Sequence, residues 1–243
     1  MASNTQQNPV SLESLMRKTL FTASVLAVAL AATFAQAHQA GDVILRAGAI
    51  TVDPREDSGD IYVGALNSSV AGTKATLDSN TQLGLNFAYM LTDKVGIELL
   101  AATPFSHDVG VAGMPGGFSG LNGKLGEIKH LPPTLSVVYY PLDSKAAFQP
   151  YVGAGVNYTW FFDDKLSSSA ESKGFNGLDM KDSWGLAFQV GADYMLTDSL
   201  MINAQVRYID IDTTGTTSYG GAKVKVDVDV DPMVYMVGLG YKF

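Results

Sequence analysis

MVYMVGLGYKF, residues 233–243, closes the chain with side chains that alternate in size and polarity. Every second position from Met233 is large and apolar, ending in Tyr241 and Phe243, whereas the positions between include Gly238 and Lys242. Because successive side chains of a strand point to opposite faces, one face suits hydrocarbon and the other a tighter, wetter space. A tilted run of about ten such residues crosses a bilayer as one strand of a closed barrel. A soluble protein rarely exposes such an apolar edge.

The composition agrees with a chain of short strands. Of 243 residues, 47% are hydrophobic and only 16% are charged, and 25 are glycine. Beyond the N-terminal segment, no run has the ~20 unbroken apolar residues that a transmembrane helix needs. The apolar residues are therefore dispersed in alternating runs, which is the pattern of half-buried strands.

Seven further alternating runs precede the last one, and the connections between them alternate long and short. The long connections are predicted as polar or glycine-rich loops near 54–74, 108–123, 163–180 and 213–222. Bacterial outer-membrane barrels combine an even strand number with short periplasmic turns and long outer loops. In lipid the sheet must also close, since an open edge leaves backbone groups unpaired. We therefore predict an all-β fold, an eight-stranded antiparallel transmembrane β-barrel with both termini on the periplasmic side.

A secreted sandwich or a lipocalin-like barrel is the competing soluble fold. Such proteins bury their apolar face and present polar residues outside. Here the apolar faces are large and aromatic, and the opposite faces are too small and glycine-rich to form a soluble exterior. The membrane barrel is favoured.

The N-terminal segment has the features of an export signal. Arg17 and Lys18 precede the apolar stretch Leu20–Phe34, which ends in the small-x-small sequence AQA at 35–37. A basic region, a short apolar region and such a site are typical of a secretory signal peptide. We expect cleavage before His38.

Two parts of the chain follow from this interpretation. Residues 1–37 are predicted to be an N-terminal extension and signal peptide, and residues 38–243 the eight-stranded outer-membrane barrel. The first fifteen residues are mostly polar, which is unusual ahead of a signal. Whether translation starts at Met1 or Met16 stays open.

Polar side chains are predicted to fill the periplasmic half of the lumen, because an eight-stranded interior barely holds its own side chains. Charges away from water must be paired, so a satisfied polar plug is expected, with a selectivity constriction beside Leu100 as a possible consequence. Glu98 and Arg207 are expected to pair across the lumen. The residues of this polar plug are Arg46, Glu98, Gln189, Asp193, Asn203, Gln205 and Arg207.

Pro132 and Pro133 stand at the start of the predicted fourth strand. Proline has no N–H to donate to a neighbouring strand and is confined in sheets to edges, strand starts and bulges. A harmless bulge at the membrane surface is one interpretation. The other is a lateral opening through which an apolar molecule leaves the lumen.

Metal and catalytic sites have little support in the sequence. Asp227, Asp229 and Asp231 alternate with valines, but alternation alone is weak evidence for coordination, so a solvated strand face is expected and no metal site is predicted. Ser106, His107 and Asp108 are adjacent, whereas the members of a catalytic triad converge from separate segments. We predict that the protein is not an enzyme.

Six stretches carry a resemblance to a known family: TQLGL (81–85), ELLAATPF (98–105), HLPPTL (130–135), PYVGAG (150–155), KDSWG (181–185) and YIDID (208–212). They resemble the OmpW family of outer-membrane proteins, and most closely its OprG branch. The resemblance covers residues 41–243 and implies an eight-stranded barrel in the bacterial outer membrane that passes small, often hydrophobic, molecules passively. Family members often carry Trp where this chain has Arg207.

The expected partners follow from this placement. They are the bilayer and its lipopolysaccharide, the barrel-assembly machinery through the strand that ends in Phe243, and small hydrophobic solutes, with no cofactor. A formal net charge of −8 disfavours nucleic acid. Two alternative functions stay open: a structural or surface-receptor barrel that phages or bacteriocins bind, and a channel for small polar solutes such as amino acids.

Overall fold

The computed structural model describes residues 37–243. Within this range, no helix is long and apolar enough to cross a membrane. The predicted signal peptide, apart from its last residue, lies outside the described residues.

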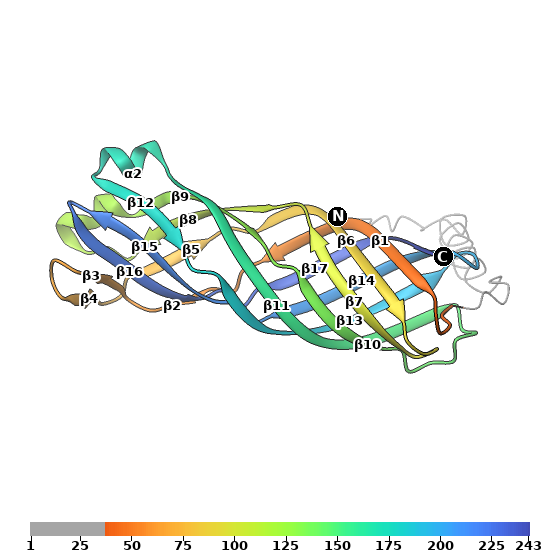
Figure 1. The fold of residues 1–243 in the computed structure, drawn as a ribbon. Coiled ribbons are helices and arrows are strands. Elements are labelled where there is room, and N and C mark those ends of the chain that lie inside the picture. The colour runs from red at the N-terminus through yellow and green to blue at the C-terminus, as the bar shows by residue number, and fades with distance from the viewer. Residues whose placement is uncertain (1–36) are drawn as a thin grey trace, which may run out of the picture.

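Eight antiparallel strands close into a barrel, which confirms the predicted fold class (Figure 1). They follow the order β10-β7-β6-β1-β17-β14-β13-β11, and β11 pairs with β10 to close the ring. The last strand of the chain pairs with the first, so neither is left with a free edge. The bounds are β1 Val43–Asp53, β6 Asn80–Met90, β7 Val95–Ala102, β10 Thr134–Tyr139, β11 Phe148–Leu166, β13 Ser183–Met195, β14 Leu200–Ile209 and β17 Met233–Lys242.

Alternation along these strands separates a lipid-facing exterior from the lumen. In β17, Val237 and Leu239 are exposed, whereas Val234 and Met236 are buried. The other strands repeat this pattern and together present an outward apolar band. Its members include Leu83, Leu85, Phe87, Leu99, Leu135, Val137, Val152, Val156, Leu186, Phe188, Val190 and Ile202.

The four predicted long loops are rich in strands, so their assignment as irregular loops was wrong. They extend the barrel wall beyond the eight-strand ring as two further sheet regions, here called the outer extension. These strands are rich in glycine, serine and aspartate, which are typical of turns, so the sequence did not indicate them as strands. Their pairing partners are also distant in sequence, as for β12 with β15 and β16 with β3. The elements are β2 Asp57–Ser58, β3 Ile61–Val63, β4 Ser68–Val70, β5 Lys74–Leu77, β8 Phe105–Ala112, η1 Gly116–Leu121, β9 Gly123–Leu131, α2 Ser168–Ser172, β12 Phe175–Met180, β15 Asp212–Tyr219 and β16 Ala222–Asp229.

The two ends of the molecule differ. The C-terminus lies at one end of the elongated barrel, and α2, β3, β4, β12 and the β15–β16 hairpin lie at the other (Figure 1). The main apolar core occupies the interior between them, from Ile50 and Leu100 up to Val228. A second buried apolar cluster, which includes Ile44, Met90 and Met201, lies toward the end that holds the C-terminus, where Ile44 pairs with Lys242.

Candidate functional site

Arg46, on β1, is the centre of the polar plug and is fully buried. Its Nε and Nη2 donate to the two carboxylate oxygens of Asp193, at 3.0 and 2.6 Å. Its Nη1 donates to Asn86 Oδ1 at 2.9 Å and to Glu98 Oε2 at 3.4 Å. Nη2 also donates to the Tyr140 hydroxyl at 2.8 Å. One guanidinium on β1 therefore binds side chains from four other strands or strand ends across the lumen.

Glu98 and Arg207 form the second ion pair, with 2.6 Å between Glu98 Oε1 and Arg207 Nη2. Gln189 donates to the same carboxylate oxygen at 2.9 Å and accepts a hydrogen bond from Arg207. Gln205 Oε1 lies 3.3 Å from Arg207 Nη2. Because Glu98 also contacts Arg46, the two ion pairs form one network. All seven predicted plug residues are buried and lie in or beside it.

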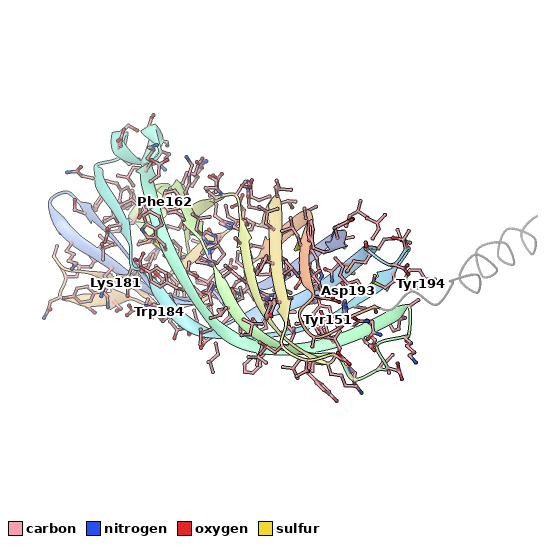
Figure 2. The ribbon with its side chains drawn as sticks, turned by 45° about the vertical axis from the view of Figure 1, so that its right-hand side comes forward. Tyr151, Phe162, Lys181, Trp184, Asp193 and Tyr194 are labelled. Carbon is pink, nitrogen blue, oxygen red and sulfur yellow. The ribbon has the colours of Figure 1, made fainter. Side chains whose placement is uncertain are left out.

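Four neutral or weakly basic side chains that the sequence argument left out complete the plug. Asn203 Nδ2 donates to Asp193 Oδ1 at 2.8 Å and to the Tyr151 hydroxyl at 3.0 Å. Tyr151 lies close to Asp193, in the half of the barrel away from Phe162 and Lys181 (Figure 2). The four residues are His38, Asn86, Tyr140 and Tyr151. Asn86 and Tyr151 occupy inward positions in the predicted strand alternation, so the sequence indicated that they face the lumen. No sequence pattern indicated this for His38 or Tyr140.

Two glycines provide the space that these large side chains occupy. A Cβ at Gly240 would lie 3.0 Å from Arg46 Cγ, and one at Gly191 would lie 2.5 Å from the Tyr151 ring. Gly240 is the register partner of Arg46 across the β1–β17 pair. The glycines on the inner face therefore have a packing role, which explains their frequency in these strands.

Leu100 lies outside the polar network. It is buried in the apolar cluster that contains Ile50, Val52, Phe105 and Ile128. The lumen therefore changes from polar to apolar at this level, so any constriction made by the plug ends below Leu100.

The lumen above Leu100 contains two apolar cavities. One of about 60 Å³ lies within the outer extension, and another of about 220 Å³ lies at the outer tip. Leu66 and Phe118 line the outer cavity and are themselves 64% and 57% exposed. Both cavities are lined by apolar side chains, among them Ile61, Leu77, Val109, Val224 and Val228 for the first and Val70, Met114, Leu121 and Tyr219 for the second.

Beside Pro132 and Pro133 the wall pairing is interrupted. The last pair below is Leu100 with Thr134, and the first pair above is Phe105 with His130. Four residues, 101–104, thus face three, 131–133, with no register pair between the two segments. Ala101 and Ala102 still pair with β6 and Leu131 with β11, and Pro104 is a third proline there. We call this the ladder gap. On the other side the pairing continues, because Tyr158 N donates to the Pro133 carbonyl at 3.1 Å.

Asn157 supports the proline side of the ladder gap. Its Nδ2 donates to the Pro132 and Pro133 carbonyls at 3.1 and 3.2 Å and to Thr134 Oγ1 at 3.0 Å. Thr159 donates to Asn157 Oδ1 at 2.7 Å and fixes its orientation. The kinked segment is therefore held in place, although the sequence analysis did not identify Asn157.

The aspartates of the last outer strand face solvent, as predicted, and the valines between them face inward. Asp227 Oδ1 accepts a hydrogen bond from Thr214 Oγ1 at 2.7 Å, and the same carboxylate forms an ion pair with Lys225. Asp231 instead lies beside Asp210 and Asp212. One carboxylate oxygen from each of the three lies within 4.8 Å of the other two, and this is the one such group found among residues 37–243. Exposed acidic groups of this kind are common, and we assign it no function.

The Ser106-His107-Asp108 sequence does not form a triad. Strand alternation in β8 turns His107 inward and its two neighbours toward the opposite face. Asp108 accepts a hydrogen bond from Lys124, at 2.5 Å. The histidine therefore has no nucleophile from this motif.

Comparisons with known proteins agree with the fold. The OmpW family model matches residues 39–243. Outer membrane protein W of Vibrio cholerae is 45% identical over 228 residues, which are 94% of this chain and 100% of that protein. The crystal structure of OprG from Pseudomonas aeruginosa matches with a TM-score of 0.80 and 52% identity, covering 86% of this chain and 98% of that chain. The structure of outer membrane protein AlkL in lipid bilayers matches with a TM-score of 0.62 and 28% identity, covering 85% and 92%.

Proposed function

Because the chain belongs to the OmpW family of outer-membrane proteins, we propose that its barrel admits small hydrophobic molecules passively and releases them sideways into the bilayer. The observation that carries this proposal is the position of the ladder gap. It lies where the apolar interior meets the buried polar plug. A solute that descends the lumen meets charged, fully buried side chains below and an unpaired wall beside it.

The chemistry of the two routes favours the lateral one. An apolar molecule gains nothing from entering the plug, where it would separate paired charges from their partners. It gains free energy by entering hydrocarbon, since apolar surface is driven out of water. The apolar cavity at the outer tip supplies the entry, and partition into lipid supplies the driving force. No energy source beyond the solute's own gradient is needed.

The first prediction separates this function from the two alternatives. Vesicles that contain the purified barrel, with lipopolysaccharide in the outer leaflet, should take up a fluorescent arene faster than matched empty vesicles. Radiolabelled glycine should enter both at the same rate, because the plug blocks the axis. Faster glycine entry would favour the polar channel, and no acceleration of either solute would favour a receptor or structural role.

The membrane contacts that we propose follow from the exposed side chains. The apolar band contacts the bilayer, and Trp160 and Trp184, both exposed, mark its outer rim beside the lipopolysaccharide. Aromatic girdles of this kind flank the apolar band of outer-membrane barrels.

The second prediction concerns assembly through Phe243. This side chain is 71% exposed and touches Tyr241 edge-on, with ring centroids 4.8 Å apart. It therefore contributes little to interior packing, and we propose that the assembly machinery recognises it. Deleting Phe243 should lower the amount of folded barrel in cells, while the same variant refolded in detergent should keep the parent's stability.

Phe243→Tyr is the matched control, because it keeps an aromatic end. Immunoblots of outer-membrane fractions, with samples heated and unheated to separate folded from unfolded barrel, give the readout. Parental amounts of folded barrel without Phe243 would contradict the proposed recognition.

A further inference from the structure

Two histidines lie among the apolar side chains of the interior, close to the buried Thr159. His107 on β8 and His130 on β9 are buried, and both point inward. Their rings stack with centroids 4.9 Å apart and an interplanar angle of 19°. Phe105 stacks on the His130 ring with centroids 5.4 Å apart, and the tilted ring of Phe161 packs against it at 5.5 Å. Aromatic packing therefore fixes both imidazoles in place.

One nitrogen of each ring has no hydrogen-bond partner in the described part of the chain. His107 Nδ1 lies 2.6 Å from the Asp78 carbonyl oxygen, which can only accept, so Nδ1 carries the proton. His107 Nε2 is then an acceptor, and it is buried without a donor. His130 Nδ1 is also buried without a partner. A buried polar atom without a partner is costly, so a ligand that hydrogen-bonds to these two nitrogens would be stabilised here.

Both imidazoles are neutral near neutral pH. β8 and β9 belong to the outer extension, beyond the eight membrane-spanning strands. Burial lowers the pKa of His107, although the Asp78 carbonyl and carboxylate raise it in part. Burial and the neighbouring His107 lower the pKa of His130 to about 3. The pair therefore offers hydrogen bonds rather than positive charge, which excludes anions as the favoured ligand.

The space at the pair fits one small polar group. A cavity of about 10 Å³ is lined by both histidines, by Thr159 and by apolar side chains that include Leu77 and Phe161. That volume is close to the minimum for one water molecule or one hydroxyl. Leu77 also lines the larger apolar cavity above, so the two spaces adjoin. An amphipathic molecule fits this arrangement, because its hydrocarbon part would occupy the apolar cavity and its single polar group the small cavity at the histidines.

We propose that His107 and His130 bind the polar head of a hydrocarbon or arene that carries one neutral hydroxyl, an alcohol or a phenol. The hydroxyl donates to His107 Nε2, and its oxygen accepts a hydrogen bond from the Nδ1–H of His130. The assignment rests on the proposed function, since it specifies the solute class for that passage. His130 is two residues before Pro132, so a solute leaving by the ladder gap passes the pair.

The experiment compares 1-naphthol with naphthalene, which differ by one hydroxyl. In vesicles with a lipopolysaccharide outer leaflet, the parent should favour naphthol, measured as protein-dependent uptake rate relative to naphthalene. The doubly substituted variant His107→Phe with His130→Phe keeps the ring stacking and removes the nitrogens. Its preference for naphthol should fall about 2- to 10-fold, as expected for one net hydrogen bond. An equal fall for both solutes, or no change in preference, would overturn the assignment.

A second measurement does not depend on transport or on how the variant folds. The chain contains only three histidines, so imidazole nitrogen resonances of the parent barrel in lipid nanodiscs are few. Naphthol should shift the His107 Nε2 resonance, whereas naphthalene should not. No shift with naphthol would show that the atoms bind water only and would overturn the proposal. A naphthol shift without protein-dependent uptake of either solute would support the site and contradict the transport function.

Discussion

Arg46→Ala should lower the free energy of unfolding by about 3–5 kcal/mol, as expected when one partner of a buried ion pair is removed. The substitution leaves the buried carboxylate of Asp193 without its two charge-assisted hydrogen bonds. It also removes a donor from Asn86, Glu98 and the Tyr140 hydroxyl. Urea unfolding in lipid vesicles, followed by the fluorescence of the two tryptophans, measures the loss.

Arg207→Ala is the matched comparison and should cost less. Its Nε and Nη1 have no hydrogen-bond partner in residues 37–243, so fewer bonds are lost. Glu98 would keep its contacts with Gln189 and Arg46. Arg207→Trp, which places the residue often found in the family, should be tolerated better still. Equal losses for Arg46→Ala and Arg207→Ala would contradict the central role of Arg46 in the plug.

Replacing Pro132 by Thr and Pro133 by Val should slow the uptake of apolar solutes by the largest factor of any change to the barrel wall. The new N–H groups restore donors at the ladder gap and allow the β9–β10 backbone to pair with residues 101–104. The variant should also unfold at a higher urea concentration than the parent. Arene uptake into lipopolysaccharide-containing vesicles is the measurement.

Pro141→Thr is the control, because Pro141 is exposed in the turn after β10, away from both the ladder gap and the outer cavities. It should leave the uptake rate unchanged. If the doubly substituted variant is more stable and still takes up the arene at the parental rate, the solute does not leave at the ladder gap. Exit at the periplasmic end would then replace the lateral route.

The fold was predictable because strand alternation is a local property of the sequence. The period of two in residues 233–243 identified both the outward face and the inward one, and the same parity placed Arg46, Glu98 and Arg207 in the lumen. The strands of the outer extension were missed, because their pairings join distant segments and their sequences are rich in turn residues. The alternation of side chains along a strand does not indicate which distant segment that strand pairs with.

The internal geometry of the site was predictable only in part. Glu98 was expected to pair with Arg207, and the two side chains are in contact. That Arg46 binds Asp193, 147 residues away, depends on how the strands stagger when the barrel closes, which no local pattern specifies. The ladder gap was suggested by Pro132 and Pro133, whereas the one-residue mismatch that includes Pro104 required the pairing register.

The most direct test of the account is the order in which a solute appears in the bilayer and in the vesicle interior. Vesicles with a lipopolysaccharide outer leaflet would carry the barrel, a lipid-anchored quencher in the bilayer and a water-soluble trap inside. After a fluorescent arene is added, the account predicts that barrel-dependent quenching in the bilayer precedes trapping in the interior. Trapping that precedes or accompanies the bilayer signal would show passage through the polar plug and would contradict lateral release.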